Sequence, residues 1–149
     1  MKDITTKLIP LLKEGYCAPQ IAQLAKKIKQ PASTIHYNIK KLEKEGKIRR
    51  YRAVFNHNKI GQGMTVFVLI NLSPDEYGNP ERIANDLSKH PEIESINIIT
   101  GDWELALKIR VKDQEEYYSF VKNVISRKGI IKISSLITLK EVKSEFINL

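Results

Sequence analysis

Polar and basic side chains recur at helical spacing between residues 31 and 45. At about 100° per residue, Ile35, Ile39 and Leu42 form one narrow apolar stripe that must face a core. The opposite side carries hydroxyl, imidazole, phenol and ammonium groups: Ser33, Thr34, His36, Tyr37, Lys40, Lys41 and Lys44. The first three kinds of group can bind base edges in a DNA groove, and lysines can bind phosphates. An ordinary solvated helix face would carry the same residue types, so the pattern alone leaves both interpretations open.

A basic extended segment follows at residues 47–55. Ile48 is expected to pack inward with Tyr51 and Val54, while three positive side chains project outward: Arg49, Arg50 and Arg52. Residues 1–60 hold 14 Lys and Arg against 4 Asp and Glu, whereas residues 61–149 hold 11 against 13. A cationic module joined to a near-neutral one indicates that the first module binds a polyanion. An uneven scatter of solubilising lysines is the alternative.

Three short helices are predicted before the basic segment, at residues 6–14, 19–28 and 31–45. Two helices, a brief turn, a third helix and a positive extended segment are the order of a winged helix-turn-helix. On this interpretation the start of the third helix contacts bases or sugars through Ser33, Thr34, His36 and Tyr37. The later basic residues then contact phosphates: Lys40, Lys41, Lys44, Arg49, Arg50 and Arg52.

These residues resemble the DNA-binding half of the Lrp/AsnC regulators, also called feast/famine regulatory proteins. The similarity spans residues 18–61 and depends on four segments: 33–35, 39–43, 46–51 and 56–61. It implies that double-stranded DNA is the partner. The family often has a serine before the second and third helices and a glycine in the turn between them. Here other residues stand at those positions: Ala18, Pro31 and Lys29.

The second half has the order of a ferredoxin-like βαββαβ domain. Its predicted strands and helices are strand 64–72, helix 80–89, strands 93–100 and 103–111, helix 113–125 and strand 131–142. Apolar residues alternate with polar ones from Trp103 to Val111, which predicts a strand with one buried face. Gly101 and Asp102 predict a tight turn before it. An RNA-recognition domain shares this order, but it needs exposed aromatic residues, whereas Trp103 is expected on the apolar face.

The chain is therefore expected to be an α+β protein in three parts. Residues 1–55 form the winged helix-turn-helix domain, residues 56–63 a polar hinge, and residues 64–149 the ferredoxin-like domain. This last part is similar to the ligand-sensing module of Lrp/AsnC proteins. With it, the resemblance extends over almost the whole chain.

The sharpest local match lies at residues 100–105, which look like the family's segment of glycine, any residue, aromatic and acid. The resemblance implies that this loop lies at a subunit interface and contacts a small effector, commonly an amino acid, through Gly101, Asp102, Trp103 and Glu104. Either acid could bind an ammonium group. The last strand often carries two hydroxyl residues in the family, and here Ile133 and Ser135 stand at those positions, so Ser135 is the remaining candidate. The alternative interpretation is that Gly101 and Asp102 only form a turn, Trp103 only belongs to the core and Glu104 is only an outward polar residue.

We therefore expect a transcription regulator with two modules. The first module binds DNA, and the second forms the dimer and senses a small molecule. As a dimer or a higher even-numbered oligomer, it would bind a pseudo-palindrome with half-sites roughly 34 Å apart or a multiple of that. The rival interpretation is an architectural DNA-coating protein with no effector. An enzyme is not expected, because the sequence has no nucleophile elbow, phosphate-binding glycine loop or dinucleotide fingerprint.

Metals, cofactors and membranes are not expected partners. One cysteine and three histidines are too scattered for a metal cluster. The apolar runs are much shorter than the roughly 20 residues of a membrane-spanning helix. With a polar start and a single cysteine, Cys17, the chain is expected to be cytoplasmic.

Overall fold

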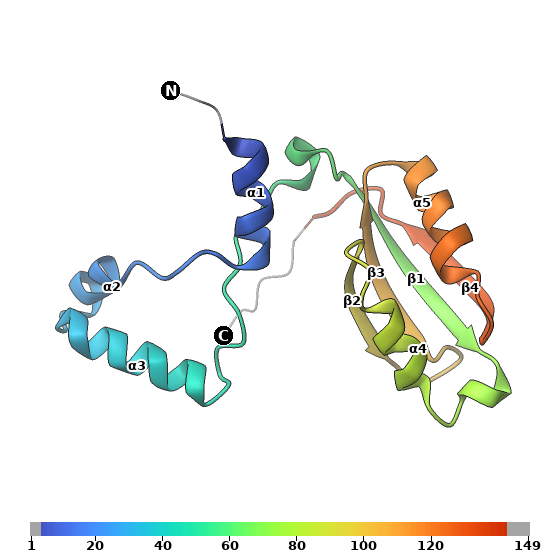
Figure 1. Ribbon diagram of the computed structural model, residues 1–149, viewed down its shortest axis with the longest axis horizontal. Coiled ribbons are helices and arrows are strands. Elements are labelled where there is room, and N and C mark those ends of the chain that lie inside the picture. The colour runs from blue at the N-terminus through green and yellow to red at the C-terminus, as the bar shows by residue number, and fades with distance from the viewer. Residues whose placement is uncertain (1–3, 143–149) are drawn as a thin grey trace. The chain divides into compact units, whose positions relative to one another are not determined.

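The computed structural model describes residues 4–142, which divide into two compact units between Phe55 and Asn56. The first unit is helical, and the second combines one antiparallel sheet with helices (Figure 1). The predicted α+β fold class, with a helix-turn-helix followed by a ferredoxin-like domain, is confirmed. Each unit is described by itself below.

The first unit contains helices α1 (Thr5–Glu14), α2 (Ile21–Ile28) and α3 (Ala32–Lys44). All three predicted helices are present, with ends shifted by one or two residues. Pro31 is the N-cap residue of α3 and has an extended backbone. Proline has no N–H to donate inside a helix, but the residue just before the first helical turn needs no such donor. Neither α2 nor α3 has a side-chain cap at its start.

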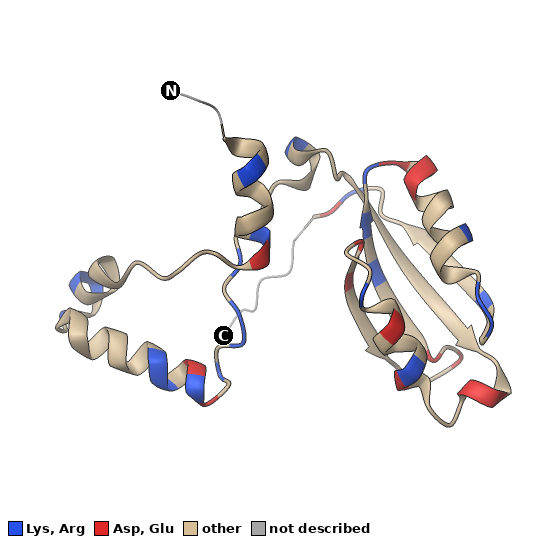
Figure 2. Ribbon diagram, viewed as in Figure 1, with Lys and Arg blue, Asp and Glu red and all other residues tan. Residues whose placement is uncertain are grey.

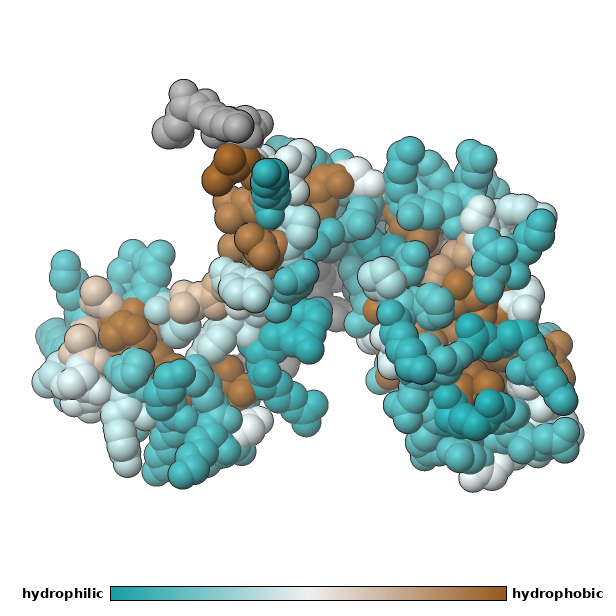
Figure 3. Space-filling model, viewed as in Figure 1, coloured by the Kyte–Doolittle hydropathy of each residue, from teal (hydrophilic) through white to brown (hydrophobic). Residues whose placement is uncertain are grey.

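The first unit buries little apolar surface. Among its described residues Ile35 is the one buried hydrophobic side chain, and Leu42 remains 36% exposed. The apolar face of α1 is open to solvent at Ile4, Leu8 and Leu11 (Figure 3). Since apolar burial supplies much of a domain's stability, this unit gains little stability from a hydrophobic core of its own.

The turn between α2 and α3 is made by a lysine in a left-handed conformation. Lys29 follows α2 with φ 56° and ψ 45°, and its backbone N–H donates to the carbonyl of Ala25. The other residues with positive φ among residues 4–142 are all glycines. A side chain in this conformation costs about 1 kcal/mol relative to glycine.

The basic extended segment after α3 does not form a hydrogen-bonded strand in the structure. Residues 47–55 run as irregular backbone, and Ala53 donates its N–H to the carbonyl of Leu12 in α1 at 3.5 Å. The physical reason is that a strand needs a neighbouring strand for its ladder, and the described residues of this unit provide none.

The second unit opens with a short 3₁₀ turn, His57–Ile60, and then has the predicted βαββαβ order. Its elements are β1 (Met64–Leu72), α4 (Pro80–Leu87), β2 (Ile93–Ile98), β3 (Leu105–Val111), α5 (Gln114–Phe120) and β4 (Ile130–Ile137). The strands lie in the order β2-β3-β1-β4 with antiparallel neighbours. Asp113 caps α5, because its carboxylate accepts the N–H of Glu116 at 2.9 Å.

The core lies between one face of this sheet and helices α4 and α5 (Figure 1). It is built from alternate residues of the two central strands: Val66, Val68, Ile70 and Leu72 of β1, and Leu105, Leu107, Ile109 and Val111 of β3. No described helix of this unit covers the opposite face, which we call the open face. Phe67 is 44% exposed there, and its cross-strand neighbour Leu136 is 53% exposed.

The outward side of β3 differs from its prediction in the middle of the strand. Lys108 and Arg110 were expected to be solvated, but their side chains are only 10% and 9% exposed. Glu94 accounts for this burial, because it accepts a hydrogen bond from Arg110 Nε at 2.9 Å and lies 3.5 Å from Lys108 Nζ. A buried charge is tolerated when it is paired in this way.

The loop between β2 and β3 is longer than the predicted tight turn. Gly101 has the left-handed φ of 111° that a turn requires, but β3 begins only at Leu105. Trp103 was expected on the buried face of that strand, and instead it lies before the strand, half-buried. The strand begins two residues later than predicted, at the point where the Glu104 carboxylate accepts the N–H of Leu72 at 2.8 Å.

Candidate nucleic-acid interface and effector loop

The face of α3 opposite Ile35 is exposed along its whole length. Every side chain predicted there to contact DNA is open to solvent: Ser33, Thr34, His36, Tyr37, Lys40, Lys41 and Lys44. Tyr37 is 70% exposed, although a phenol ring is partly apolar. The helix therefore presents hydroxyl, imidazole and phenol groups in its first turns and ammonium groups in its later turns.

Two of the lysines on this face are already paired with acids. Lys40 Nζ donates to Glu43 at 2.8 Å, and Lys41 Nζ lies 3.9 Å from Glu45. The hydrogen bond from Lys40 holds the pKa of the Glu43 carboxyl below its usual value. Tyr51 also donates its hydroxyl proton to Glu43, at 3.1 Å. These exposed pairs hold the lysines loosely, since surface ion pairs contribute little free energy.

Other cations on this unit have no acidic partner among the described residues. Lys44, Arg49 and Arg50 are exposed and form no ion pair within residues 4–142, whereas Lys47 pairs with Glu45 at 2.6 Å. Lysines and arginines follow one another along the end of α3 and into the next segment (Figure 2). Arg52, the third predicted arginine of that segment, is also exposed. The unpaired cations Lys44, Arg49 and Arg50 thus lie beyond the paired Lys40 and Lys41, with the paired Lys47 between them.

Gly15 fixes the path of the arginine segment within this unit. Its φ is 107°, and a Cβ atom at this position would lie 2.7 Å from the carbonyl oxygen of Tyr51. A Cβ atom essentially never lies so close to a carbonyl oxygen, so a side chain at Gly15 would displace the backbone between Arg50 and Arg52. The end of α1 is therefore in direct contact with the segment that carries the arginines.

The predicted effector loop forms a second cluster, in the other unit. Asn71, near the end of β1, donates its side-chain amide to the backbone carbonyl of Asp102 and lies 3.4 Å from the carboxylate of Glu104. Glu104 is thus engaged by the amide of Asn71 and the N–H of Leu72. The Asp102 side chain is exposed. Of the two acids proposed as ammonium partners, Asp102 is the one that stands open to solvent.

Trp103 has a cation on its ring. Lys132 Nζ, from β4, lies 5.3 Å from the ring centroid, within the range of a cation–π contact. Neither Asn71 nor Lys132 was predicted as part of the site. A polar residue interrupting the apolar run of β1 was the available signal for Asn71, but nothing in the sequence singles out Lys132.

Ser135 lies apart from this loop within one chain. It pairs with Val68 on the helix-covered side of the sheet, and its hydroxyl is 2.6 Å from that of Tyr117. Lys132 of the same strand reaches the loop, but Ser135 lies three residues further along β4 and its hydroxyl is paired with Tyr117 on the other side of the sheet. Burial raises the pKa of Tyr117, which keeps the phenol neutral and able to donate.

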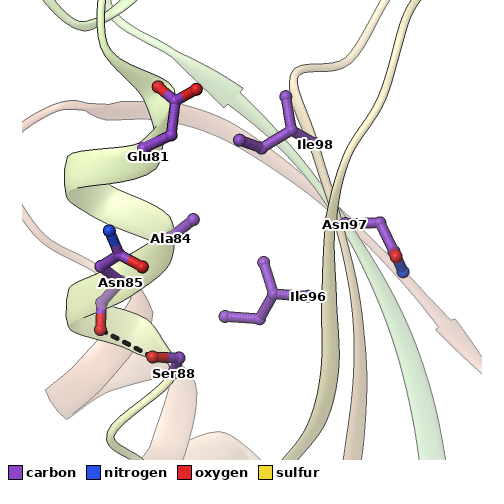
Figure 4. Close-up of a pocket in the computed structure, with 7 residues that line it drawn as sticks. All are labelled: Glu81, Ala84, Asn85, Ser88, Ile96, Asn97 and Ile98. Atoms are coloured by element: carbon purple, nitrogen blue, oxygen red, sulfur yellow. Dashed lines mark hydrogen bonds between the residues drawn. The ribbon is translucent and has the colours of Figure 1, made fainter. Parts of the chain in front are cut away.

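An open groove of about 380 Å³ lies between α4 and the edge strand β2 (Figure 4). Ala84, Ile96 and Ile98 point into it, whereas Asn97 turns away. Ser88 on its rim already donates to the carbonyl of Asn85 at 2.8 Å. The groove contains none of the residues predicted to bind an effector, so it is distinct from the loop at Gly101.

Two other kinds of feature are absent from residues 4–142. No group of three or more His, Cys, Asp or Glu side chains is arranged to hold a metal ion. No helix in this range combines the length and the apolar character needed to span a bilayer.

Two family models match the chain. Residues 65–147 match the Lrp/AsnC ligand binding domain, and residues 20–49 match a winged helix-turn-helix DNA-binding model. The first match covers the sheet unit and the second covers α2, α3 and the beginning of the basic segment. The resemblance predicted from the sequence is confirmed.

Named relatives and solved structures agree with these matches. The HTH-type transcriptional regulator FL11 of Pyrococcus furiosus is 33% identical over 140 residues, covering 94% of this chain and 90% of FL11. An AsnC family regulator from Agrobacterium tumefaciens has a TM-score of 0.78 at 27% identity, covering 100% of this chain and 97% of that one. A regulator of Neisseria meningitidis, solved as a complex with L-Met, has a TM-score of 0.75 at 24% identity, covering 97% of this chain and 94% of that one.

Proposed function

This chain belongs to the Lrp/AsnC family of transcriptional regulators. We propose that it binds a pseudo-palindromic operator as a dimer or a higher even-numbered oligomer and responds to a small effector such as an amino acid. The observation that carries the DNA-binding part is the exposed face of α3. Its polar first turns and basic later turns are followed by arginines without acidic partners among the described residues. This order suits a helix that reads base edges at its start and holds phosphates beyond it.

The dimer is proposed to form through the open face of the sheet. Phe67 and Leu136 are half exposed there, and no described helix of the unit covers them. Antiparallel sheets with one solvated face normally carry polar residues on that face, so exposed Phe and Leu favour a protein partner. A two-fold dimer would present two copies of α3 to successive turns of the major groove, roughly 34 Å apart or a multiple of that.

The effector site is proposed at Gly101, Asp102, Trp103 and Glu104, with Asn71 and Lys132 as further members. The open carboxylate of Asp102 suits an ammonium group, and the cation of Lys132 suits a carboxylate. Ser135 would join such a site only from a second subunit, because within one chain its hydroxyl is paired with Tyr117 on the helix-covered side of the sheet.

Footprinting of the purified protein on its own upstream promoter tests the DNA-binding part. We expect discrete protected patches whose centres repeat at about 10 base pairs or a multiple of that. Protection that spreads evenly along any duplex, with no effector response, would favour the architectural alternative. No protection at all would contradict the DNA-binding proposal.

A panel of the common amino acids, scored by thermal shift and by sedimentation, tests the effector part. At least one amino acid should raise the melting temperature of the wild type, and D102N should lose that response while still binding DNA. The matched control is D75N, because Asp75 is an exposed aspartate of the same unit outside the loop. If no amino acid changes the melting temperature or the sedimentation of the wild type, the effector part of the proposal is wrong.

A further inference from the structure

The end of α2 and the turn after it carry a second cluster of cations. Lys26 and Lys27 lie in the last turn of α2, and Lys29 forms the turn itself. All three side chains are exposed. Residues 15–42 contain five lysines and not one Asp or Glu, so no acid in this stretch can neutralise them. The cationic surface of the first unit therefore begins before α3.

Lys29 stands where its backbone conformation favours glycine. It is the one non-glycine residue with positive φ among residues 4–142. A positive charge after a helix is favourable to the helix dipole, but Lys26 and Lys27 already supply two charges there. Stability alone thus gives little reason for a lysine in place of glycine at this turn.

The turn is next to the part of α3 that is expected to enter the major groove. Lys29 precedes Ser33 by four residues, and the turn joins the end of α2 to the beginning of α3 (Figures 1 and 2). In a helix-turn-helix the helix before the recognition helix crosses the DNA backbone. A flexible ammonium group at the turn is therefore within reach of the phosphates that border the groove.

Building on the DNA-binding function proposed above, we propose that Lys26, Lys27 and Lys29 bind phosphates of the same duplex, with Lys29 as the principal contact. The left-handed turn then retains a lysine because the charge is needed at that point, although glycine would fit the backbone better. The occupant is duplex DNA, recognised by its phosphates without regard to sequence.

Two substitutions separate the charge from the backbone conformation. K29Q removes the charge and keeps a side chain of similar length, so its melting temperature should match that of the wild type. K29G removes the charge and relieves the left-handed conformation, so it should melt at a higher temperature. Both should make the negative slope of log K against log salt shallower by about 0.9, which weakens binding roughly five-fold at about 0.15 M salt.

The control is K122Q, which changes the net charge by the same amount at an exposed lysine of the other unit. Its salt slope should equal that of the wild type. The inference is overturned if K29Q and K29G keep the wild-type slope, or if K29G melts at a lower temperature than the wild type. If the wild type itself shows no salt-dependent binding to duplex DNA, the proposed function fails first, so the two failures are distinguishable.

Discussion

Cations of the first unit fall into two groups according to their partners. Lys40 and Lys41 face Glu43 and Glu45 on the same helix, whereas Arg49 and Arg50 have no acidic partner among the described residues. A paired lysine must give up its carboxylate before it binds a phosphate, but an unpaired arginine does not. The arginines should therefore contribute more to binding than the lysines of α3.

R49A and R50A should each weaken binding to all duplexes alike. Each removes one phosphate contact, so the negative slope of log K against log salt should become shallower by about 0.9 in both variants. Fluorescence anisotropy titrations at several salt concentrations measure this. K128A, at an exposed lysine of the other unit, should leave the slope unchanged. Unaltered slopes in the arginine variants would contradict the phosphate role.

His36 and Tyr37 should behave differently from the arginines. Substituting His36 by Ala or Tyr37 by Phe removes a group that can bond to a base edge, which is worth about 1–3 kcal/mol of discrimination. The preference among operator variants should therefore change by about five-fold to 150-fold, while the salt slope stays as in the wild type. Selection from a randomised duplex library measures the preference. An equal loss on every duplex would place these residues on the backbone instead.

Among the elements, strand β3 depends on an ionic network on its outward side. Burial alone would raise the pKa of the Glu94 carboxyl, but the hydrogen bond from Arg110, together with the charges of Arg110, Lys108 and His57, brings it below its ordinary value. His57 Nε2 lies 3.9 Å from Glu94, and Glu141 adds a second acid 3.7 Å from Arg110. This network ties β2, β3 and the 3₁₀ turn at His57 together.

The network predicts a particular loss of stability in acid. Because the pKa of Glu94 is lower in the folded chain, the unfolded chain takes up the proton first as the pH falls. The contribution is full above the ordinary glutamate value of about 4.3 and is lost progressively below it. E94Q should lower the unfolding free energy by roughly 1–3 kcal/mol at neutral pH and flatten its decline in acid, as measured by urea unfolding at several pH values. If E94Q loses unfolding free energy in acid as steeply as the wild type does, this role of Glu94 is contradicted.

The elements also divide by how well the sequence predicts them. Strand β1 matches its prediction at both ends, because an apolar run bounded by Gly63 and Ser73 is governed by local sequence. The start of β3 was missed because a side chain, the Glu104 carboxylate, takes the N–H of Leu72. The strand expected within residues 47–55 needs a partner strand, and residue pattern alone does not supply one.

The candidate sites follow the same division. The exposed face of α3 could be predicted residue by residue, since Ile35 and Ile39 fix the helix orientation. The loop cluster could be predicted only within its own segment, at Gly101 to Glu104. Lys132 joins that cluster through the sheet, about 30 residues later in the chain, and such a long-range contact leaves no local signal.

At the scale of the whole molecule, function is proposed to depend on a second copy of the chain. F67D or L136E should prevent association through the open face, because each introduces a charge among half-exposed apolar groups. Sedimentation should show a monomer, and affinity for a full operator should fall to that of a half-site. Y118D, at a 67% exposed residue of α5, is the control and should remain dimeric. Dimers in F67D and L136E would place the interface elsewhere.

Gly15 contributes no charge, hydroxyl or ring, yet the Tyr51 carbonyl oxygen lies only 2.7 Å from where its first side-chain carbon would be. We expect one added methyl group to displace the backbone that carries Arg50 and Arg52 and thereby to change the affinity for duplex DNA. We therefore expect a substitution of Gly15 to change DNA affinity through the neighbouring arginine segment, although residue 15 itself supplies no group that binds DNA.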